Sequence, residues 1–120
     1  KAKHTELKHT CAKLLRTPDT ELEKYLKSEY PKEHDSFCFL RCMYILNGAW
    51  DDATGVSLDR MFELKGGDEL SKEDFTEQTK HCFGEFRKAN GEEITCYCQK
   101  AYGPLNCFRE YFQARQTTTQ

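Results

Sequence analysis

The sequence has few isoleucine and valine residues, little net charge and no long hydrophobic run. Only two of its 120 residues are isoleucine and one is valine, which argues against a fold built from strands. No apolar run approaches the ~20 residues of a bilayer-spanning helix, so we expect no membrane span. The formal net charge of −2 lacks the basic excess that is typical of proteins that bind duplex nucleic acid. We therefore expect no nucleic-acid partner.

Signatures of catalysis and of cofactor binding are also missing. The sequence has no nucleophile elbow, no His-Glu-x-x-His and no phosphate-binding glycine loop, so we expect neither an enzyme nor a cofactor. The side chains that could ligate zinc are Cys38, Cys42, Cys96, Cys98, His34 and His81. Because Cys-x-Cys is not a usual zinc-finger spacing and no second matched pair exists, we expect no metal site.

The apolar residues that are present are mostly aromatic and recur at helical spacing. The 15 aromatic residues outnumber the 14 residues of Leu, Ile and Val. The clearest pattern begins at a Ser71–Asp74 capping box and continues with an inward stripe of Phe75, Thr79, Cys82, Phe83 and Phe86. The sequence predicts one all-α domain over 1–120 with six or seven short helices. Their expected ranges are Thr5–Arg16, Pro18–Tyr30 capped by Thr17, Lys32–Asn47, Ser57–Gly66, Ser71–Phe86, Glu93–Tyr102 and Pro104–Arg115.

Seven cysteines in a chain of this length indicate a disulfide framework in an oxidising compartment. The first residues, Lys1–His4, are polar, and no apolar leader segment follows them. We interpret the chain as the mature form of a secreted, extracellular protein.

Six of the cysteines form a recognisable pattern. Without Cys96 the spacing is C-x26-C-x3-C-x39-C-x15-C-x8-C. This spacing, in a helical chain of this length, resembles the pheromone and general odorant-binding protein family of insects. Hallmarks of that family are the x3 and x8 gaps. The resemblance implies short helices around a central apolar cavity, stapled by the pairs Cys11–Cys42, Cys38–Cys98 and Cys82–Cys107.

The seventh cysteine departs from the family pattern. The gap from Cys82 to Cys98 is slightly long for the family, and a gap to Cys96 would be more typical. The x8 gap to Cys107 favours Cys98 as the framework cysteine instead. We predict that Cys96 is a free thiol, either buried or available for an intermolecular bridge.

The resemblance also implies a carrier that binds a small hydrophobic ligand, such as an odorant, a pheromone, a fatty acid or a hormone-like lipid, in an aromatic-lined pocket. We expect a hydroxyl of Tyr30, Tyr102 or Tyr111 to orient the ligand. The polar tail Gln113–Gln120 lacks large apolar residues, so we expect it to be a weak lid at most. The side chains expected to line the pocket are Leu14, Tyr30, Phe39, Met43, Leu46, Trp50, Met61, Phe62, Phe75, Phe83, Phe86, Tyr102, Phe108, Tyr111 and Phe112.

A function of another class stays open. Salivary proteins of blood-feeding flies have a similar cysteine frame, and they scavenge host amines or eicosanoids or bind host proteins. An amine scavenger should place a buried carboxylate beside aromatic rings. The acidic residues next to Trp50, Asp51 and Asp52, are where this sequence would place one. With either function, a receptor or a host protein is a further candidate partner. We expect the chain to be a monomer or a weak homodimer.

Overall fold

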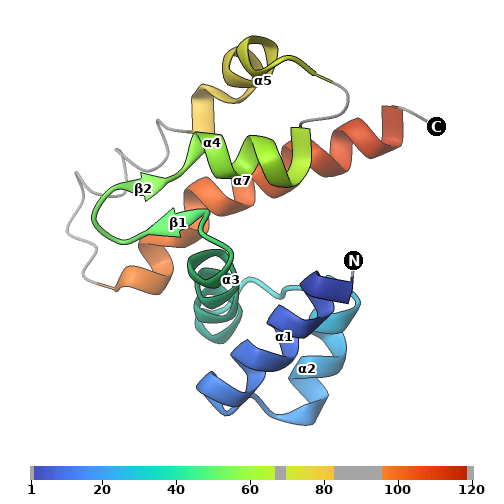
Figure 1. The fold of residues 1–120 in the computed structure, drawn as a ribbon. Helices are drawn as coiled ribbons and strands as arrows, with labels where there is room; N and C mark the ends of the chain where they lie inside the picture. The colour runs from blue at the N-terminus through green and yellow to red at the C-terminus, as the bar shows by residue number, and fades with distance from the viewer. Residues whose placement is uncertain (1, 67–69, 83–95, 119–120) are drawn as a thin grey trace.

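The computed structural model describes residues 2–66, 70–82 and 96–118, which form an all-α fold (Figure 1). Helix α3 lies near the middle, α1 and α2 pack at one end, and the long helix α7 runs past α3 toward α4 and α5 (Figure 1). Within these residues, no helix combines the length and the apolarity that a membrane crossing requires. The elements are α1 (Ala2–Leu15), α2 (Asp19–Leu26), α3 (His34–Leu46), β1 (Trp50–Asp51), β2 (Gly55–Val56), α4 (Leu58–Met61), the π-helical turn η1 (Phe62–Gly66), α5 (Lys72–Thr79) and α7 (Tyr97–Thr118).

Local signals for helix ends are mostly confirmed. The hydroxyl oxygens of Ser57 and Ser71 accept hydrogen bonds from the third amide that follows each of them, at 3.2 and 3.1 Å. Gly48 follows α3 with a φ of 85°, a left-handed conformation that glycine adopts without a Cβ clash. The expected Thr17 cap is wrong, because Pro18 holds the N-cap position of α2 and has no side-chain hydrogen bond to offer.

Two short strands depart from the expectation of helices alone. Trp50 pairs with Val56 and Asp51 with Gly55 in an antiparallel hairpin. The Asp51 carboxylate accepts hydrogen bonds from the backbone N–H groups of Ala53 and Thr54 in the turn, at 2.7 and 3.1 Å. Turn chemistry of this kind produces a hairpin without strong strand formers.

Helix α7 also departs from the prediction, which divided it at Pro104. The helix runs from Tyr97 to Thr118 with Pro104 inside it. A proline removes one backbone donor, but both sides of Pro104 are fixed in place here: Leu105 and Phe108 are buried, and cysteines on either side form disulfides. Residues 113–118 of the expected tail continue the same helix, and the start of the expected Glu93–Tyr102 helix lies outside the described residues.

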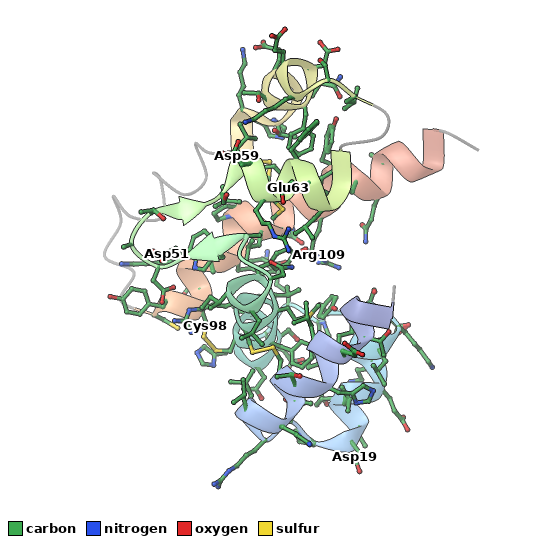
Figure 2. All side chains as sticks on the ribbon, viewed as in Figure 1. Asp19, Asp51, Asp59, Glu63, Cys98 and Arg109 are labelled. Atoms are coloured by element: carbon green, nitrogen blue, oxygen red, sulfur yellow. A yellow bond between two sulfur atoms is a disulfide. The ribbon has the colours of Figure 1, made fainter. Side chains whose placement is uncertain are left out.

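The core consists of two clusters on different faces of α3. Leu40 and Tyr44 face the first, and Phe39 and Met43 face the second, as the 3.6-residue repeat requires. Figure 2 shows side chains in the space between α3 and the ribbons on either side of it. The α3–α7 cluster contains Leu40, Tyr44, Ala49, Trp50, Met61, Phe75, Cys82, Ala101, Leu105, Phe108 and Phe112. The α1–α3 cluster contains Cys11, Ala12, Tyr25, Phe39 and Met43.

Three disulfides join the elements, with the pairing that the resemblance implies. They are Cys11–Cys42, Cys38–Cys98 and Cys82–Cys107, with Cα–Cα distances of 5.9, 4.6 and 5.6 Å. Because Cys42 and Cys38 both belong to α3, that helix is joined covalently to α1 and to α7. The remaining cysteine, Cys96, is a half-buried free thiol.

Candidate ligand-binding site

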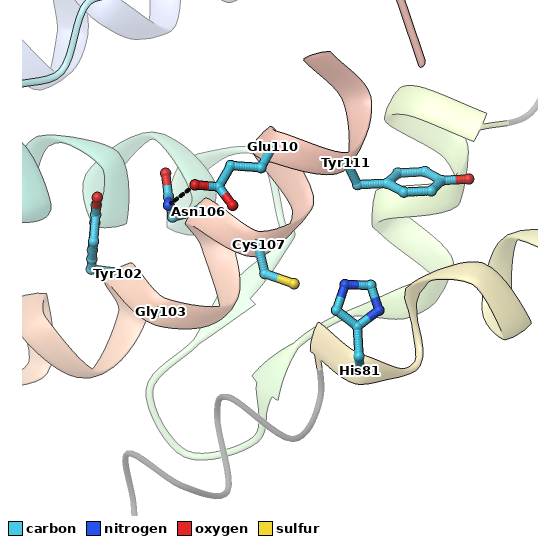
Figure 3. Close-up of a pocket in the computed structure, with 7 residues that line it drawn as sticks. All are labelled: His81, Tyr102, Gly103, Asn106, Cys107, Glu110 and Tyr111. Carbon is cyan, nitrogen blue, oxygen red and sulfur yellow. Dashed lines mark hydrogen bonds between the residues drawn. The ribbon is translucent and has the colours of Figure 1, made fainter. Parts of the chain in front are cut away.

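A pocket of about 510 Å³ lies along one face of α7 (Figure 3). The residues from α7 in its wall follow one another at alternating steps of one and three, so each lies four positions from another and they share one face of the helix. His81, which follows α5, forms the opposite side. The residues that line the pocket are His81, Tyr102, Gly103, Asn106, Cys107, Glu110 and Tyr111.

The inner wall of the pocket is the outer surface of the core. Tyr102, Cys107 and Tyr111 pack against the α3–α7 cluster. The ring of Tyr111 lies edge-on to that of Phe75, with ring centroids 6.2 Å apart. The ring centroids of Tyr102 and Phe37 lie 4.0 Å apart. An apolar ligand in this pocket would therefore contact aromatic rings that the core already holds in place.

Polar groups lie along the same wall and bond to one another. The Asn106 amide donates to a Glu110 carboxylate oxygen at 3.0 Å and accepts a hydrogen bond from Arg109 at 3.2 Å. The Tyr111 hydroxyl donates to the side-chain oxygen of Gln78. The Asn106–Glu110 pair gives the wall both a donor and an acceptor, which suits a ligand that carries one polar group.

The structure divides the predicted lining residues into several groups. Tyr102 and Tyr111 line the pocket. Phe83 and Phe86 lie outside the described residues. Those in or packed against the α3–α7 cluster, behind the wall, are Trp50, Met61, Phe62, Phe75, Phe108 and Phe112. Phe39 and Met43 belong to the α1–α3 cluster, on the other face of α3, and Tyr30 packs against both clusters.

Leu14 and Leu46 were expected to line an enclosed pocket, but both are exposed. Their exposed fractions are 65% and 45%, and neither belongs to a core cluster. Both lie in the last turn of a helix. A stripe of apolar residues in the sequence identifies the face of a helix that packs inward. It does not show how far along the helix the neighbouring elements cover that face.

Tyr30 does not offer its hydroxyl to the pocket. The hydroxyl donates to the Tyr25 carbonyl at 3.4 Å and lies 3.8 Å from the Met43 sulfur. The guanidinium of Arg109, labelled in Figure 2, lies 4.6 Å from the centre of the Tyr30 ring. Burial raises the pKa of Tyr30, so its hydroxyl stays protonated. This side chain fixes α7 against the N-terminal half of the chain.

Five lining residues were not expected: His81, Gly103, Asn106, Cys107 and Glu110. Most are polar or small, so an analysis of hydrophobic stripes passes over them. The helical spacing of 103, 106, 107 and 110 with Tyr102 and Tyr111 is the signal that could have found them.

A second, smaller pocket of about 210 Å³ lies near the start of α2. Its wall includes charged side chains from both α2 and α3, and it offers less than half the volume of the pocket on α7. Its lining residues are Leu15, Arg16, Thr17, Pro18, Glu21, Tyr25, Asp35 and Cys38.

The carboxylate beside Trp50 is already paired. Asp52 accepts hydrogen bonds from two Arg41 nitrogens, one of them at 2.9 Å, and from the Trp50 indole N–H at 3.0 Å. The hydrogen bonds from Arg41 hold the pKa of Asp52 below its usual range. Arg41 therefore occupies the place of the cation that an amine-binding carboxylate would take.

Asp52→Asn is expected to lower the free energy of unfolding at neutral pH by about 1 kcal/mol, because it removes a half-buried charged hydrogen-bond partner of Arg41. Since the pKa of Asp52 is lowered by folding, this stabilisation exists above the unfolded value of about 3.9 and disappears as the pH falls through the folded value. Urea unfolding over this pH range measures it.

Glu63→Gln, which removes the more exposed ion pair with Arg60, is the matched control and should cost less than about 0.5 kcal/mol. If the difference in free energy of unfolding between wild type and the Asp52 variant stays constant down to the lowest pH, the proposed role of the Arg41–Asp52 ion pair is contradicted.

Two groups of histidine and cysteine come together in the described part of the chain. They are His34 with Cys96 and Cys98, and His81 with Cys82 and Cys107. Three of these four cysteines are held in disulfides. Neither group therefore supplies the four free ligands of a structural zinc site.

The PBP/GOBP family matches residues 1–111 of this chain. Among curated proteins, the chain is similar to general odorant-binding protein 99a of Drosophila melanogaster, 26% identical over 98 residues, which are 81% of this chain and 66% of that protein. General odorant-binding protein 99b of the same species is 28% identical over 107 residues, which are 87% of this chain and 68% of that one. The chain thus spans about two thirds of the length of these relatives.

Solved structures agree with this match. A crystal structure of Anopheles gambiae odorant-binding protein 22a with bound cyclohexanone superposes with a TM-score of 0.76 at 26% identity, covering 94% of both chains. A structure of the same protein in the open status for ligand binding superposes with a TM-score of 0.75 at 26% identity, covering 92% of each chain. The sequence match covers nearly the whole chain, and the helices superpose along the same length. The chain therefore belongs to the PBP/GOBP family, the pheromone and general odorant-binding proteins that its cysteine spacing resembles.

Proposed function

We propose that this protein is an extracellular carrier that binds a small hydrophobic ligand in the pocket on α7. The observation that carries the proposal is a pocket of about 510 Å³ whose inner wall consists of side chains packed directly on an aromatic core. This volume is typical of small-molecule sites, which span roughly 300–1,000 Å³. The family of the chain, and the cyclohexanone bound to its mosquito relative, support the same class of ligand.

The composition of the wall narrows the ligand class. Contact with Tyr102 and Tyr111 would supply most of the affinity, at about 25 cal/mol for each Å² of apolar surface removed from water. The Asn106–Glu110 pair offers one donor and one acceptor. A compact ketone, an alcohol or a fatty acid with a single polar group fits this wall better than a highly charged compound.

A fluorescent apolar probe, N-phenyl-1-naphthylamine, is expected to bind the wild-type protein with a stoichiometry of about 1:1. Cyclohexanone, long-chain alcohols or fatty acids should displace it, because they compete for the same apolar wall. A fluorescence titration with each competitor measures this. If neither the probe nor any of these competitors binds, the carrier proposal is wrong, and a protein that recognises a host macromolecule with its surface becomes the better hypothesis.

Three variants locate the binding in the same titration. Tyr111→Ala should weaken probe binding by more than about fivefold, equivalent to 1 kcal/mol, because it removes ring contact from the wall. Tyr111→Phe keeps the ring and should have a much smaller effect. Deletion of residues 117–120, which contain no large apolar side chain, should leave the affinity within about threefold. A deletion that is more damaging than Tyr111→Ala would contradict the assignment of the wall to α7.

A further inference from the structure

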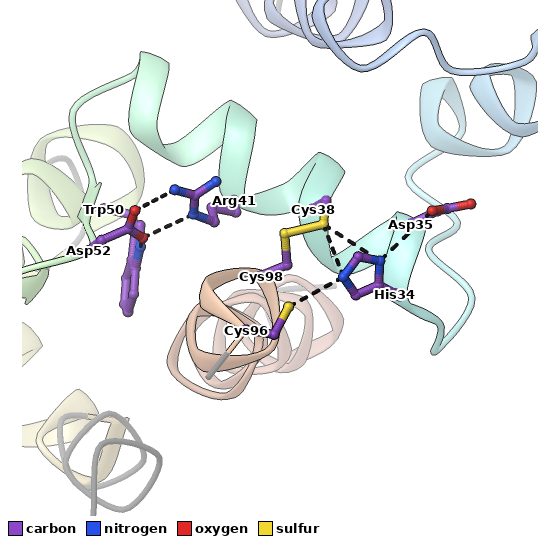
Figure 4. The surroundings of a disulfide bond; sticks show 8 residues. All are labelled: His34, Asp35, Cys38, Arg41, Trp50, Asp52, Cys96 and Cys98. Atoms are coloured by element: carbon purple, nitrogen blue, oxygen red, sulfur yellow. Dashed lines mark hydrogen bonds and ion pairs between the residues drawn. A yellow bond between two sulfur atoms is a disulfide. The ribbon is translucent and has the colours of Figure 1, made fainter. Parts of the chain in front are cut away.

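His34, the free thiol Cys96 and the disulfide Cys38–Cys98 meet at the start of α7 (Figure 4). The His34 Nε2 atom lies 3.3 Å from the Cys96 sulfur and 3.7 Å from the Cys38 sulfur. The Cys96 and Cys98 sulfurs and a His34 ring nitrogen all lie within 4.8 Å of one another. A thiol, the disulfide that it could attack and a histidine that could take its proton therefore lie in one cluster.

The surroundings of Cys96 favour its thiolate. Cys96 immediately precedes the first residue of α7, and the backbone N–H groups of Gln99 and Cys98 donate to its sulfur. These donors, together with the hydrogen bond to His34, lower the pKa of the Cys96 thiol. Arg41 on α3 adds a positive charge near the same sulfur. The thiolate is the nucleophile in exchange, so these contacts favour reaction.

We propose that this cluster is a thiol–disulfide exchange site in which Cys96 and Cys98 alternate as the partner of Cys38. The Cys96 proton passes to His34 Nε2, and the Cys96 thiolate attacks the Cys38 sulfur. The Cys96–Cys38 bond forms as the Cys38–Cys98 bond breaks, and Cys98 leaves as a thiolate that takes the proton back. One disulfide and one thiol are present before and after, so the step needs no oxidant or reductant.

The two cysteines that would compete for Cys38 lie close together, with their sulfurs within 4.8 Å of each other. Cys96 and Cys98 are two residues apart at the start of α7, and His34 on α3 contacts the sulfurs of both the nucleophile and its target. The sequence shows the same ambiguity, because each of the two cysteines satisfies one of the family's gaps. The exchange shifts by two residues the point at which α3 holds α7, the helix that carries the pocket wall.

The chain contains its own control. The other disulfide beside a histidine, Cys82–Cys107, has the His81 Nε2 atom 3.7 Å from a sulfur. All seven cysteines are described, and no third cysteine belongs to that group. The exchange site should therefore scramble, whereas Cys82–Cys107 should not.

Alkylation of the native protein tests the proposal. Wild-type protein is held at about pH 8, where thiolates form, and then labelled with N-ethylmaleimide. Chymotrypsin cleaves after Tyr97 and so separates Cys96 from Cys98 for mass spectrometry. We expect at least about a tenth of the label on Cys98, increasing with incubation time, and none on Cys82 or Cys107. Label found on Cys96 alone, however long the incubation, would overturn the proposal.

Two variants extend the test. Cys98→Ser should form the Cys38–Cys96 bond and have no free thiol; folded protein with two free thiols would contradict the exchange. If this variant does not fold, the wild-type labelling decides alone. His34→Gln should slow the appearance of label on Cys98 by at least about threefold and change its pH profile, because the variant lacks the base. If the rate of labelling at Cys98 and its pH profile are unchanged, His34 is not the base in the exchange.

Discussion

Phe75→Ala is expected to lower the free energy of unfolding by about 3–5 kcal/mol, the range for removing a large buried ring. Phe75 has an exposed fraction of 0%, and its ring lies between those of Phe62, Phe108 and Phe112, at centroid distances of 5.5, 6.2 and 5.9 Å. Removing it leaves a cavity that these rings, held on η1 and α7, can only partly fill. Urea unfolding followed by circular dichroism measures the loss.

Leu14→Ala is the matched control for this prediction. Leu14 is 65% exposed, so its truncation should change stability by less than about 0.5 kcal/mol. If the two variants are destabilised equally, Phe75 is not at the centre of the core, and the pocket wall does not pack against a rigid core.

Removal of the Cys11–Cys42 disulfide is expected to cost about 3.5 kcal/mol. The bond joins residues 31 positions apart, and the chain-entropy estimate for a loop of that size gives this value. The double variant Cys11→Ala with Cys42→Ala avoids placing a hydroxyl in the buried position of Cys11. Guanidinium unfolding of this variant and of wild type, both without reductant, measures the difference.

Cys96→Ser provides the control, because it removes a thiol and leaves all three disulfides in place. Its stability should stay within about 0.5 kcal/mol of wild type. A disulfide variant as stable as Cys96→Ser would show that the packing of Ala12 and its neighbours alone holds α1 on α3.

Features that depend on neighbouring residues could be predicted from the sequence. The Ser57 and Ser71 caps and the Gly48 helix end follow from backbone hydrogen bonding within a few residues. The disulfide pairing lies beyond such local chemistry and came instead from the family resemblance. The all-α fold class was predicted from the helical spacing of apolar residues and the small number of isoleucine and valine residues, and the resemblance added how the helices are joined.

Features decided by tertiary packing could not be predicted. Pro104 is an ordinary helix boundary in sequence, yet buried neighbours and two disulfides keep α7 continuous through it. The pocket wall was found only in part, since Tyr102 and Tyr111 are apolar enough to be noticed whereas Asn106 and Glu110 are not. Their importance depends on which face of α7 borders a pocket, and hydrophobic periodicity carries no such information.

Amide chemical-shift mapping of the ¹⁵N-labelled protein, titrated with cyclohexanone, tests the central claim most directly. The account predicts saturable shifts that are largest along one face of α7, at Tyr102, Asn106, Cys107 and Tyr111, with little change around the smaller pocket near the start of α2. Shifts confined to that smaller pocket, or no saturable shift at any residue, would contradict a ligand site on α7.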